Sequence, residues 1–180
     1  MCIRDRSWGG KRIEAFTSRE KLETVEDAIP LLQSWDDLAD RYDPAMAKSN
    51  YEKTLERWEA KRKQLLADAP EGSKPKIPRR PKLKVPPKLE PNHPSSIYNQ
   101  KVAPWTHYAV AGTIWYQGES NSGHAALYEK LLTALIEDWR QKWNSEMPFY
   151  VVQLANYREP TGEPGVPDSW AELQLSLIHI

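Results

Sequence analysis

The chain has little sulfur, no long apolar run and no excess of charge, and each absence excludes a class of protein. Its single cysteine, Cys2, excludes an internal disulfide and a thiolate metal cluster. The sequence contains no run of about 18 apolar residues, the length that a membrane-spanning helix needs. No signal peptide is visible at the start. The 25 Lys and Arg residues balance the 25 Asp and Glu residues, so no net positive charge is available to gather nucleic acid.

Metal and cofactor motifs are missing as well. No two histidines or cysteines have the spacing of metal ligands, and Gly9-Gly10 matches neither a dinucleotide-binding fingerprint nor a phosphate loop. We therefore expect no metal and no cofactor. The 180 residues suffice for one domain. An apolar fraction of 39% beside 8 Trp and 8 Tyr indicates a packed core diluted by a polar segment.

That polar segment is predicted at residues 19–94, as a helical and proline-rich insertion. The helical, strongly charged pattern begins at Ser18, and Asp43-Pro44 is a plausible helix start. The apolar stripe of this helix is thin: Tyr51, Leu55, Trp58 and Leu65.

Residues 70–94 hold eight of the 15 prolines, and seven basic residues but no acidic one lie between Lys74 and Lys88. This is typical of an extended polyproline-type segment. Its PxxP spacings fit a docking strip for an SH3-like partner or an acidic polymer. We favour the alternative, a surface insertion laid along a domain.

The second half of the chain has an α/β pattern. The apolar run at 109–116 suits a central strand buried on both faces. A second apolar run, at 149–155, follows a helical pattern over 124–143, which completes a strand–helix–strand unit. The fold class is therefore α/β, a parallel sheet with helices covering both faces. One face of the predicted helix is apolar: Tyr128, Leu132, Leu135, Trp139 and Trp143.

Polar side chains follow both predicted strands. Gln117, directly after the first strand, has two side-chain N–H donors, and Glu119 could orient its amide or a substrate hydroxyl. Ligands of open parallel sheets bind at the carboxyl ends of the strands, so this rim is a candidate oxyanion or sugar-hydroxyl site. The loop 117–124 also fits a connection whose Ser and Asn cap the next helix. The polar residues after the second strand are Asn156, Tyr157 and Arg158.

The histidines are weaker candidates for a catalytic base. His124 lies in the first turn of a predicted helix, where a histidine is usually solvated, and His107 precedes a strand at the opposite sheet edge. Glu90 and His93 lie in the proline-rich segment, where we expect no packing to hold them as a pair.

Five separated blocks carry a family resemblance: residues 7–16, 96–104, 114–121, 153–157 and 169–173. The third block, Ile-Trp-Tyr-Gln-Gly-Glu-Ser-Asn, is specific. In this order the blocks resemble the sialate O-acetylesterase family of carbohydrate esterases, a branch of the SGNH hydrolases. The resemblance implies a three-layer α/β/α, flavodoxin-like fold over residues 7–174. It also implies metal-free hydrolysis of acetyl esters on sugars through a serine acyl-enzyme.

The resemblance assigns roles to particular residues. It implies that Gly10 or Gly9 offers a backbone N–H, and Gln117 a side-chain N–H, to the oxyanion of the tetrahedral intermediate. Glu119 and Asn121 would bind or shape the substrate, an acetylated sugar or glycan. An exposed Trp8 could stack on a sugar ring. A periplasmic or extracellular location is expected from the resemblance alone.

The chain departs from the family pattern in three places. Lys11 and Phe16 stand where the family usually has Thr and Trp. The Gly-Gln-Ser-Asn turn of the nucleophile and the Asp-x-x-His of the base do not occur in the chain. Residues 1–6 and 175–180 resemble translated adapter DNA at the edges of metagenomic reads, so we expect non-native ends.

We therefore expect an inactive, incomplete esterase fragment, with an exposed sheet edge and poor solubility. The alternative hypothesis is a non-catalytic carbohydrate-binding or partner-binding α/β protein.

Overall fold

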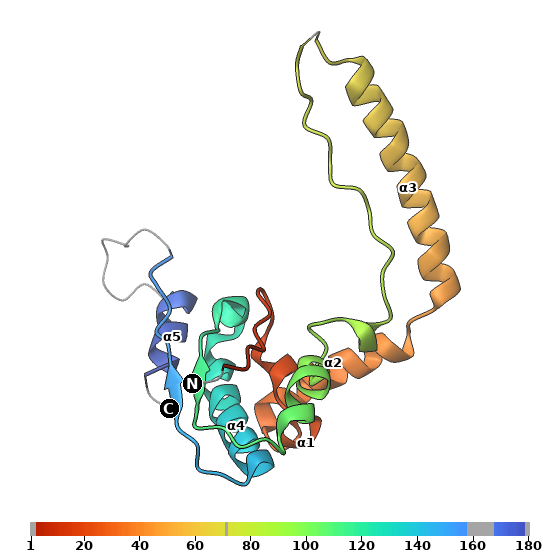
Figure 1. The fold of residues 1–180 in the computed structure, drawn as a ribbon. Coiled ribbons are helices and arrows are strands. Elements are labelled where there is room, and N and C mark those ends of the chain that lie inside the picture. Colours follow the sequence, from red (N-terminus) through yellow and green to blue (C-terminus); the bar gives the residue numbers. More distant parts are fainter. Residues whose placement is uncertain (1–2, 71, 158–167, 179–180) are drawn as a thin grey trace. The chain divides into compact units, whose positions relative to one another are not determined.

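The computed structural model describes residues 3–70, 72–157 and 168–178 (Figure 1). The chain divides into two compact units. The first comprises Met1–Asp36 and Lys88–Ile180, and the second comprises Asp37–Pro87.

A parallel strand pair connected by a long helix is the centre of the first unit. Strands β1 (Thr113–Trp115) and β2 (Phe149–Val151) pair in parallel, with Thr113 opposite Phe149. Helix α4 (Ala125–Trp143) connects them. The predicted strand–helix–strand unit is confirmed, although each paired strand is shorter than its apolar run.

Helix α4 buries the apolar face that the sequence predicts. Tyr128, Leu132, Leu135 and Trp139 are buried, and Trp143 is half-buried. The helix follows the 3-10 helix η6 (Glu119–His124), and no side chain caps its start. It ends at Asn144, whose left-handed conformation terminates the helix.

An aromatic cluster joins the sheet to α4 and to the N-terminal part of the chain. The Trp115 ring meets Phe16 edge-on at 5.5 Å and Trp139 at 5.9 Å. Trp139 also donates its indole N–H to the Phe16 carbonyl at 3.0 Å. Phe16 belongs to η1 (Ile13–Phe16), whose four residues are all buried. The N-terminal segment is therefore part of the core of this unit.

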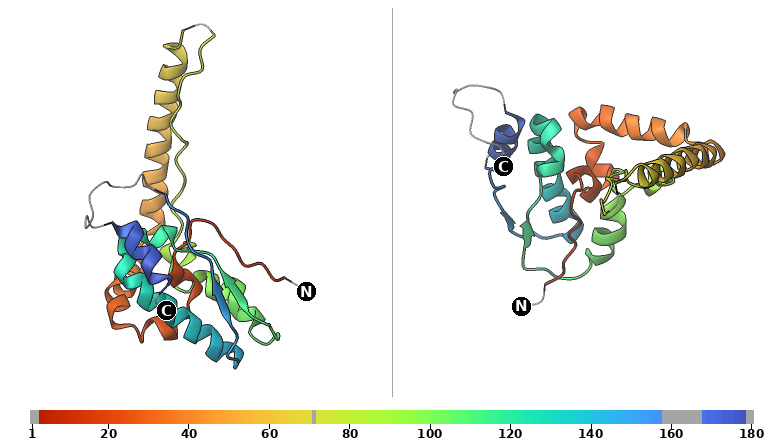
Figure 2. Two further views of the ribbon diagram at one scale, coloured as in Figure 1. Left: turned by 90° about the vertical axis from the view of Figure 1, so that its left-hand side faces the viewer. Right: turned by 90° about the horizontal axis from the view of Figure 1, so that it is seen from above.

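One face of the small sheet is exposed. Ile114 is 76% exposed and Tyr150 is 64% exposed, whereas Trp115, which points the other way, is buried. Figure 2 shows α4 and α5 (Ser169–Ser176) on the same side of the strands. The expectation that the first strand is buried on both faces is wrong for the described residues, because both helices cover one face. These residues form a mixed α/β unit with a small parallel sheet.

Short helices complete the first unit. Helix α1 (Arg19–Leu22) begins at Ser18, whose N–H and hydroxyl both donate to the buried carboxylate of Asp138 on α4 at 2.7 Å. The other short elements of this unit before the strands are η2 (Glu26–Ala28), η4 (Tyr98–Val102) and η5 (Ala103–Trp105). Helix α2 (Ile29–Asp40) and η3 (Pro87–Leu89) each include residues of both units.

The second unit is a long helix with an extended segment along it. Helix α3 (Pro44–Ala67) starts where the sequence predicts: the Asp43 carboxylate caps it by accepting from the Ala45 N–H at 2.8 Å. The returning chain runs beside the helix (Figure 1). The Trp58 indole N–H donates to the Pro78 carbonyl at 2.8 Å, which attaches that chain to α3.

Candidate active site

The candidate site is built around the side-chain amide of Gln117, directly after β1. Its oxygen accepts from the Tyr128 hydroxyl at 2.9 Å. Its nitrogen donates to the Lys11 carbonyl and to the Asn121 side-chain oxygen, both at 2.9 Å. The amide is therefore held between the end of β1, helix α4 and the N-terminal segment. Both of its N–H groups have acceptors within the protein.

Tyr128 determines which end of this amide faces which partner. Burial raises the pKa of Tyr128 well above its ordinary value of 10.0, so the hydroxyl keeps its proton. It accepts from the Trp115 indole N–H at 3.3 Å, and its proton is shared between the side-chain and backbone oxygens of Gln117, each at 2.9 Å. A donor on that side directs the amide nitrogen toward Lys11 and Asn121.

Asn121 connects Gln117 to a buried carboxylate. It is 2% exposed, and its oxygen also accepts from the Ile13 backbone N–H at 3.0 Å. Its nitrogen donates to Glu14 Oε2 at 2.9 Å. Glu14 is 1% exposed, and its other oxygen has no hydrogen-bond partner in the described part of the chain, with the Arg12 guanidinium at 3.9 Å. This network fixes the plane of the Gln117 amide from the side opposite Tyr128.

Gly118 allows the end of β1 to pack closely against its neighbours. Its φ is +152°, and a Cβ there would lie 2.9 Å from Leu154 Cδ1 and 3.5 Å from Leu173 Cδ2. A larger residue would push Gln117 out of place, because side chains after β2 and on α5 leave no room.

The structure places the glycine turn next to Gln117. Gly10 has φ +69° and, like Gly9, is exposed with open space where a Cβ would be. The next residue, Lys11, supplies the carbonyl that Gln117 contacts. Gly9, Gly10 and Gln117 therefore belong to one locality.

Trp8 is 42% exposed beside this turn. The Lys101 ammonium lies 4.7 Å and the Lys11 ammonium 5.6 Å from the centroid of its ring, which is within the range of cation–π attraction. The ring is therefore held by two cations while part of its surface stays open.

Glu119 is exposed and makes none of the Gln117 contacts. Tyr128 and Asn121, and not Glu119, contact the amide and orient it. Asn156 accepts from Gln174 at 3.2 Å, and Tyr157 packs on Trp170 at 5.3 Å. Arg158 lies outside the described residues.

Sequence reasoning missed Glu14 as a member of this network and treated Tyr128 as a core residue. An acidic residue inside the buried segment Ile13–Phe16 was the available signal for Glu14, because a buried carboxylate needs polar partners. No comparable signal existed for Tyr128, whose position in the apolar face of α4 is that of an ordinary core residue.

Within residues 3–70, 72–157 and 168–178, no group of three or more His, Cys, Asp and Glu side chains could hold a metal ion. None of the helices described is long and apolar enough to cross a bilayer.

Comparison with known families places the chain in the class of carbohydrate esterases. Residues 88–178, about half of the chain, match the family described as carbohydrate esterase, sialic acid-specific acetylesterase. The chain belongs to this family. The match includes Gln117, Asn121 and Tyr128, while Glu14 and the glycine turn lie before it.

Curated relatives carry the name sialate O-acetylesterase. The Mus musculus protein is 36% identical over 76 residues, covering 37% of this chain and 14% of the relative. The Homo sapiens protein is 35% identical over 75 residues, with the same coverages. The Rattus norvegicus protein is 26% identical over 160 residues, 84% of this chain and 25% of the relative. The chain thus spans a quarter or less of their length. No solved structure matches it.

Proposed function

We propose that this chain is part of a carbohydrate esterase that hydrolyses O-acetyl esters of sialic acid or related sugars through a serine acyl-enzyme. The observation that carries the proposal is the Gln117 amide, fixed by Tyr128 and Asn121 at the carboxyl end of a parallel strand. A donor held in place before reaction stabilises developing negative charge without reorganisation cost. Family membership supports the ester and sugar chemistry.

In this proposal the oxyanion takes the place of the Lys11 carbonyl at Gln117 Nε2. Asn121 and Tyr128 keep their bonds, so the amide does not rotate when the carbonyl gives way. The backbone N–H of Gly10 or Gly9 is the second donor, and the positive φ of Gly10 lets the turn approach a ligand closely. Loss of one such donor typically costs about 3–4 kcal/mol of barrier.

Other residues would shape the substrate site. Glu119 is exposed next to Gln117 and can accept from a sugar hydroxyl. Asn121 acts through Gln117, and the open surface of Trp8 can stack on a sugar ring. The nucleophilic serine and its histidine are proposed to lie in Gly-Gln-Ser-Asn and Asp-x-x-His segments, which these 180 residues do not contain.

The first test measures acetate release from O-acetylated sialic acid by the 180-residue chain. We expect no turnover, because no nucleophile motif is present. Turnover that disappears in Ser7→Ala or Ser120→Ala would contradict this assignment. Two results together would favour the alternative, a non-catalytic carbohydrate-binding protein. The reading frame would be closed by stop codons at both ends, and the chain would bind the acetylated sugar without turnover.

The second test extends the reading frame into the source DNA on both sides. If the extension encodes the two missing motifs, Gln117→Ala in the extended protein should lower kcat by on the order of 10²–10³-fold with little change in KM. Gln153→Ala is the matched control, because that amide is exposed and contacts the Gln174 carbonyl at 3.3 Å. Equal kcat values for the parent and Gln117→Ala would overturn the role of Gln117.

A further inference from the structure

The proline-rich segment runs along the apolar stripe of α3 (Figure 1), whose residues are half-buried. The stripe residue Trp58 donates its indole N–H to the Pro78 carbonyl at 2.8 Å, and the Tyr42 hydroxyl donates to the Lys84 carbonyl at 3.0 Å. Both bonds use the backbone of the segment and leave its basic side chains unengaged. The second unit therefore holds the extended segment at two points.

Exposure along this segment repeats every three residues, which is the period of a polyproline II helix. The proline edge is partly covered: Pro75 and Pro81 are half-buried, and the Pro78 carbonyl between them is bound to Trp58. The next edge is exposed at three successive turns, and each of its three residues there is a cation. We call these residues the cation edge: Lys76, Arg79 and Lys82.

This arrangement disfavours an SH3-like partner. Such domains seat the prolines of a PxxP segment in aromatic-lined grooves, and here two of the three prolines on that edge are half-buried. An acidic polymer needs only the exposed cations. Of the two docking functions that the PxxP spacings fit, the structure therefore favours the acidic polymer.

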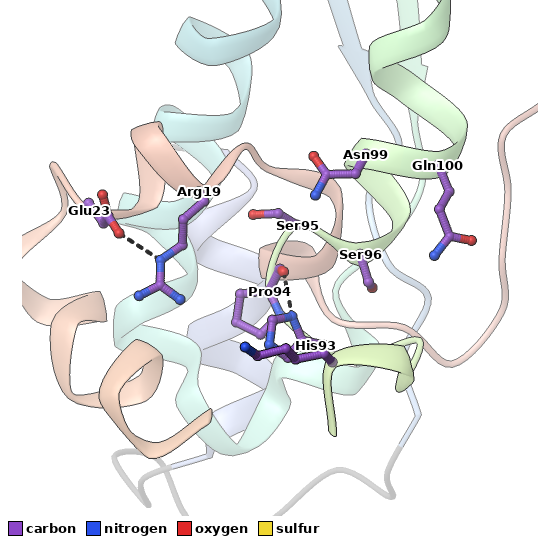
Figure 3. A pocket seen from close by; sticks show the side chains of 9 residues that line it. Arg19, Glu23, His93, Pro94, Ser95, Ser96, Asn99 and Gln100 are labelled. Atoms are coloured by element: carbon purple, nitrogen blue, oxygen red, sulfur yellow. Dashed lines mark hydrogen bonds and ion pairs between the residues drawn. The ribbon is translucent and has the colours of Figure 1, made fainter. Parts of the chain in front are cut away.

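The charges of the segment are not neutralised within the described chain. Six exposed cations lie between residues 74 and 84. Within residues 3–70, 72–157 and 168–178, none of the six has an ion-pair partner. Arg19 of the first unit differs, because it is paired with Glu23 (Figure 3) and with Asp36, both at 2.7 Å. The cations of the segment are thus available to an external anion.

We propose that the cation edge binds a linear acidic glycan, a chain of carboxylate-bearing sugars. Polyproline II rises about 3.1 Å per residue, so successive cations of the edge are about 9 Å apart and the three span about 19 Å. The prolines fix the backbone before binding, so little conformational entropy is lost when a polymer docks on it. A row of charges matches a polymer that repeats its own charge along its length.

Two observations favour a glycan over a nucleic acid. The segment between Lys74 and Lys88 contains no aromatic residue, whereas surfaces for single-stranded nucleic acids combine cations with aromatic rings that stack on the bases. The family is that of sialic acid-specific acetylesterases, and sialic acid carries a carboxylate. The choice of glycan rests on the proposed function, but the binding of an acidic polymer does not.

The experiment measures the binding of the 180-residue chain to fluorescently labelled oligosialic acid without O-acetyl groups, by anisotropy. This probe has no ester, so its binding is independent of turnover. We expect the Kd to rise with salt between about 50 and 200 mM, and neutral dextran of the same length not to bind. The double variant Arg79→Gln, Lys82→Gln should bind about fivefold more weakly, as expected for two exposed ion pairs, and should show a shallower salt dependence.

The double variant Lys53→Gln, Arg57→Gln is the matched control, because it removes the same two types of charge from the same unit. Both residues are exposed and lie on the half of α3 turned away from the apolar stripe. A helix is about 10–12 Å wide, more than the Debye length of about 8 Å at 0.15 M salt. The control should therefore bind like the parent at that salt concentration.

Three results would overturn the proposal. Dextran could bind as tightly as oligosialic acid, the two double variants could bind alike, or oligodeoxythymidylate of equal charge could bind more tightly than the glycan. The last result would identify a nucleic-acid surface instead. If the extended protein binds oligosialic acid through the cation edge but releases no acetate, the proposed esterase function fails and this proposal stands.

Discussion

At the residue scale, the orientation of the Gln117 amide depends on the side chains packed beside it. Gln117 is useful as a donor only if its amide has one orientation, and that orientation is imposed by the Tyr128 hydroxyl. Asn121 repeats the constraint from the other side and is itself held by Glu14. Because these partners are buried, removing one leaves polar groups without water or protein to replace it.

Tyr128→Phe tests this dependence. The variant leaves the Gln117 oxygen and the Trp115 indole N–H unpaired, so we expect it to lower the free energy of unfolding by about 1–3 kcal/mol. Urea denaturation followed by tryptophan fluorescence measures the change. Tyr150→Phe is the control, because Tyr150 is 64% exposed and its change should lie within about 0.5 kcal/mol. Equal losses in both variants would contradict the assigned role of Tyr128.

The same hydroxyl predicts a pH dependence. Burial raises the pKa of Tyr128 above the ordinary 10.0, so the folded protein holds this proton more tightly than the unfolded chain does. The resulting stability is complete below pH 10 and is lost as pH rises from 10.0 toward the folded-state pKa. Between pH 9 and 11 the free energy of unfolding should therefore fall more steeply with pH for the parent than for Tyr128→Phe. The same pH dependence in both proteins would contradict the prediction.

At the element scale, α3 forms largely through its own local signals. No side chain of the helix is buried, so capping and propensity matter more for it than for α4, which packs a complete face into the core. Asp43 satisfies the N–H groups of Ala45 and Met46, and Pro44 occupies a position that tolerates the absence of an N–H.

Asp43→Ala should weaken this helix by about 1 kcal/mol. Far-ultraviolet circular dichroism during thermal unfolding should show an earlier loss of helical signal. Asp68→Ala is the matched control at the other end of α3. A carboxylate there faces the negative end of the helix dipole, so its removal should not destabilise the helix. If Asp68→Ala destabilises the helix more than Asp43→Ala does, the capping role of Asp43 is contradicted.

The strand pair is the element most dependent on its surroundings. Each paired strand has three residues, and two strands alone are marginally stable in water. Trp115 packs against Phe16 and Trp139, whereas Ile114 and Tyr150 face outward. We relate the expected poor solubility to this exposed apolar face.

At the scale of the whole molecule, charge is divided between the two units although the chain is neutral. Residues 37–87 contain 13 basic and 8 acidic residues, and the remainder contains 12 basic and 17 acidic residues. The basic residues between Lys74 and Lys84 lie in an extended segment and are exposed. This is the part of the second unit that is most accessible to a protease.

Limited trypsin digestion should therefore cut first after Lys76, Arg79, Lys82 or Lys84. Lys74 and Arg80 precede proline and resist cleavage. Extended backbone fits a protease site with less local unfolding than a helix requires. Mass spectrometry identifies the first fragments, and early cleavage inside α4, after Lys130 or Lys142, would contradict the expected order.

Local patterns in the sequence by themselves determined the helix start at Asp43, the buried face of α4, the parallel order of the two strands and the family. Tertiary structure alone decided that Gln117 donates to Lys11 and Asn121, that Glu14 joins the network, and that one sheet face stays open. The reason is physical: periodicity and capping act over a few residues, whereas the contacts of Gln117 with Lys11 and of Asn121 with Glu14 join residues about 100 positions apart. Their geometry depends on how η1, β1 and α4 pack together.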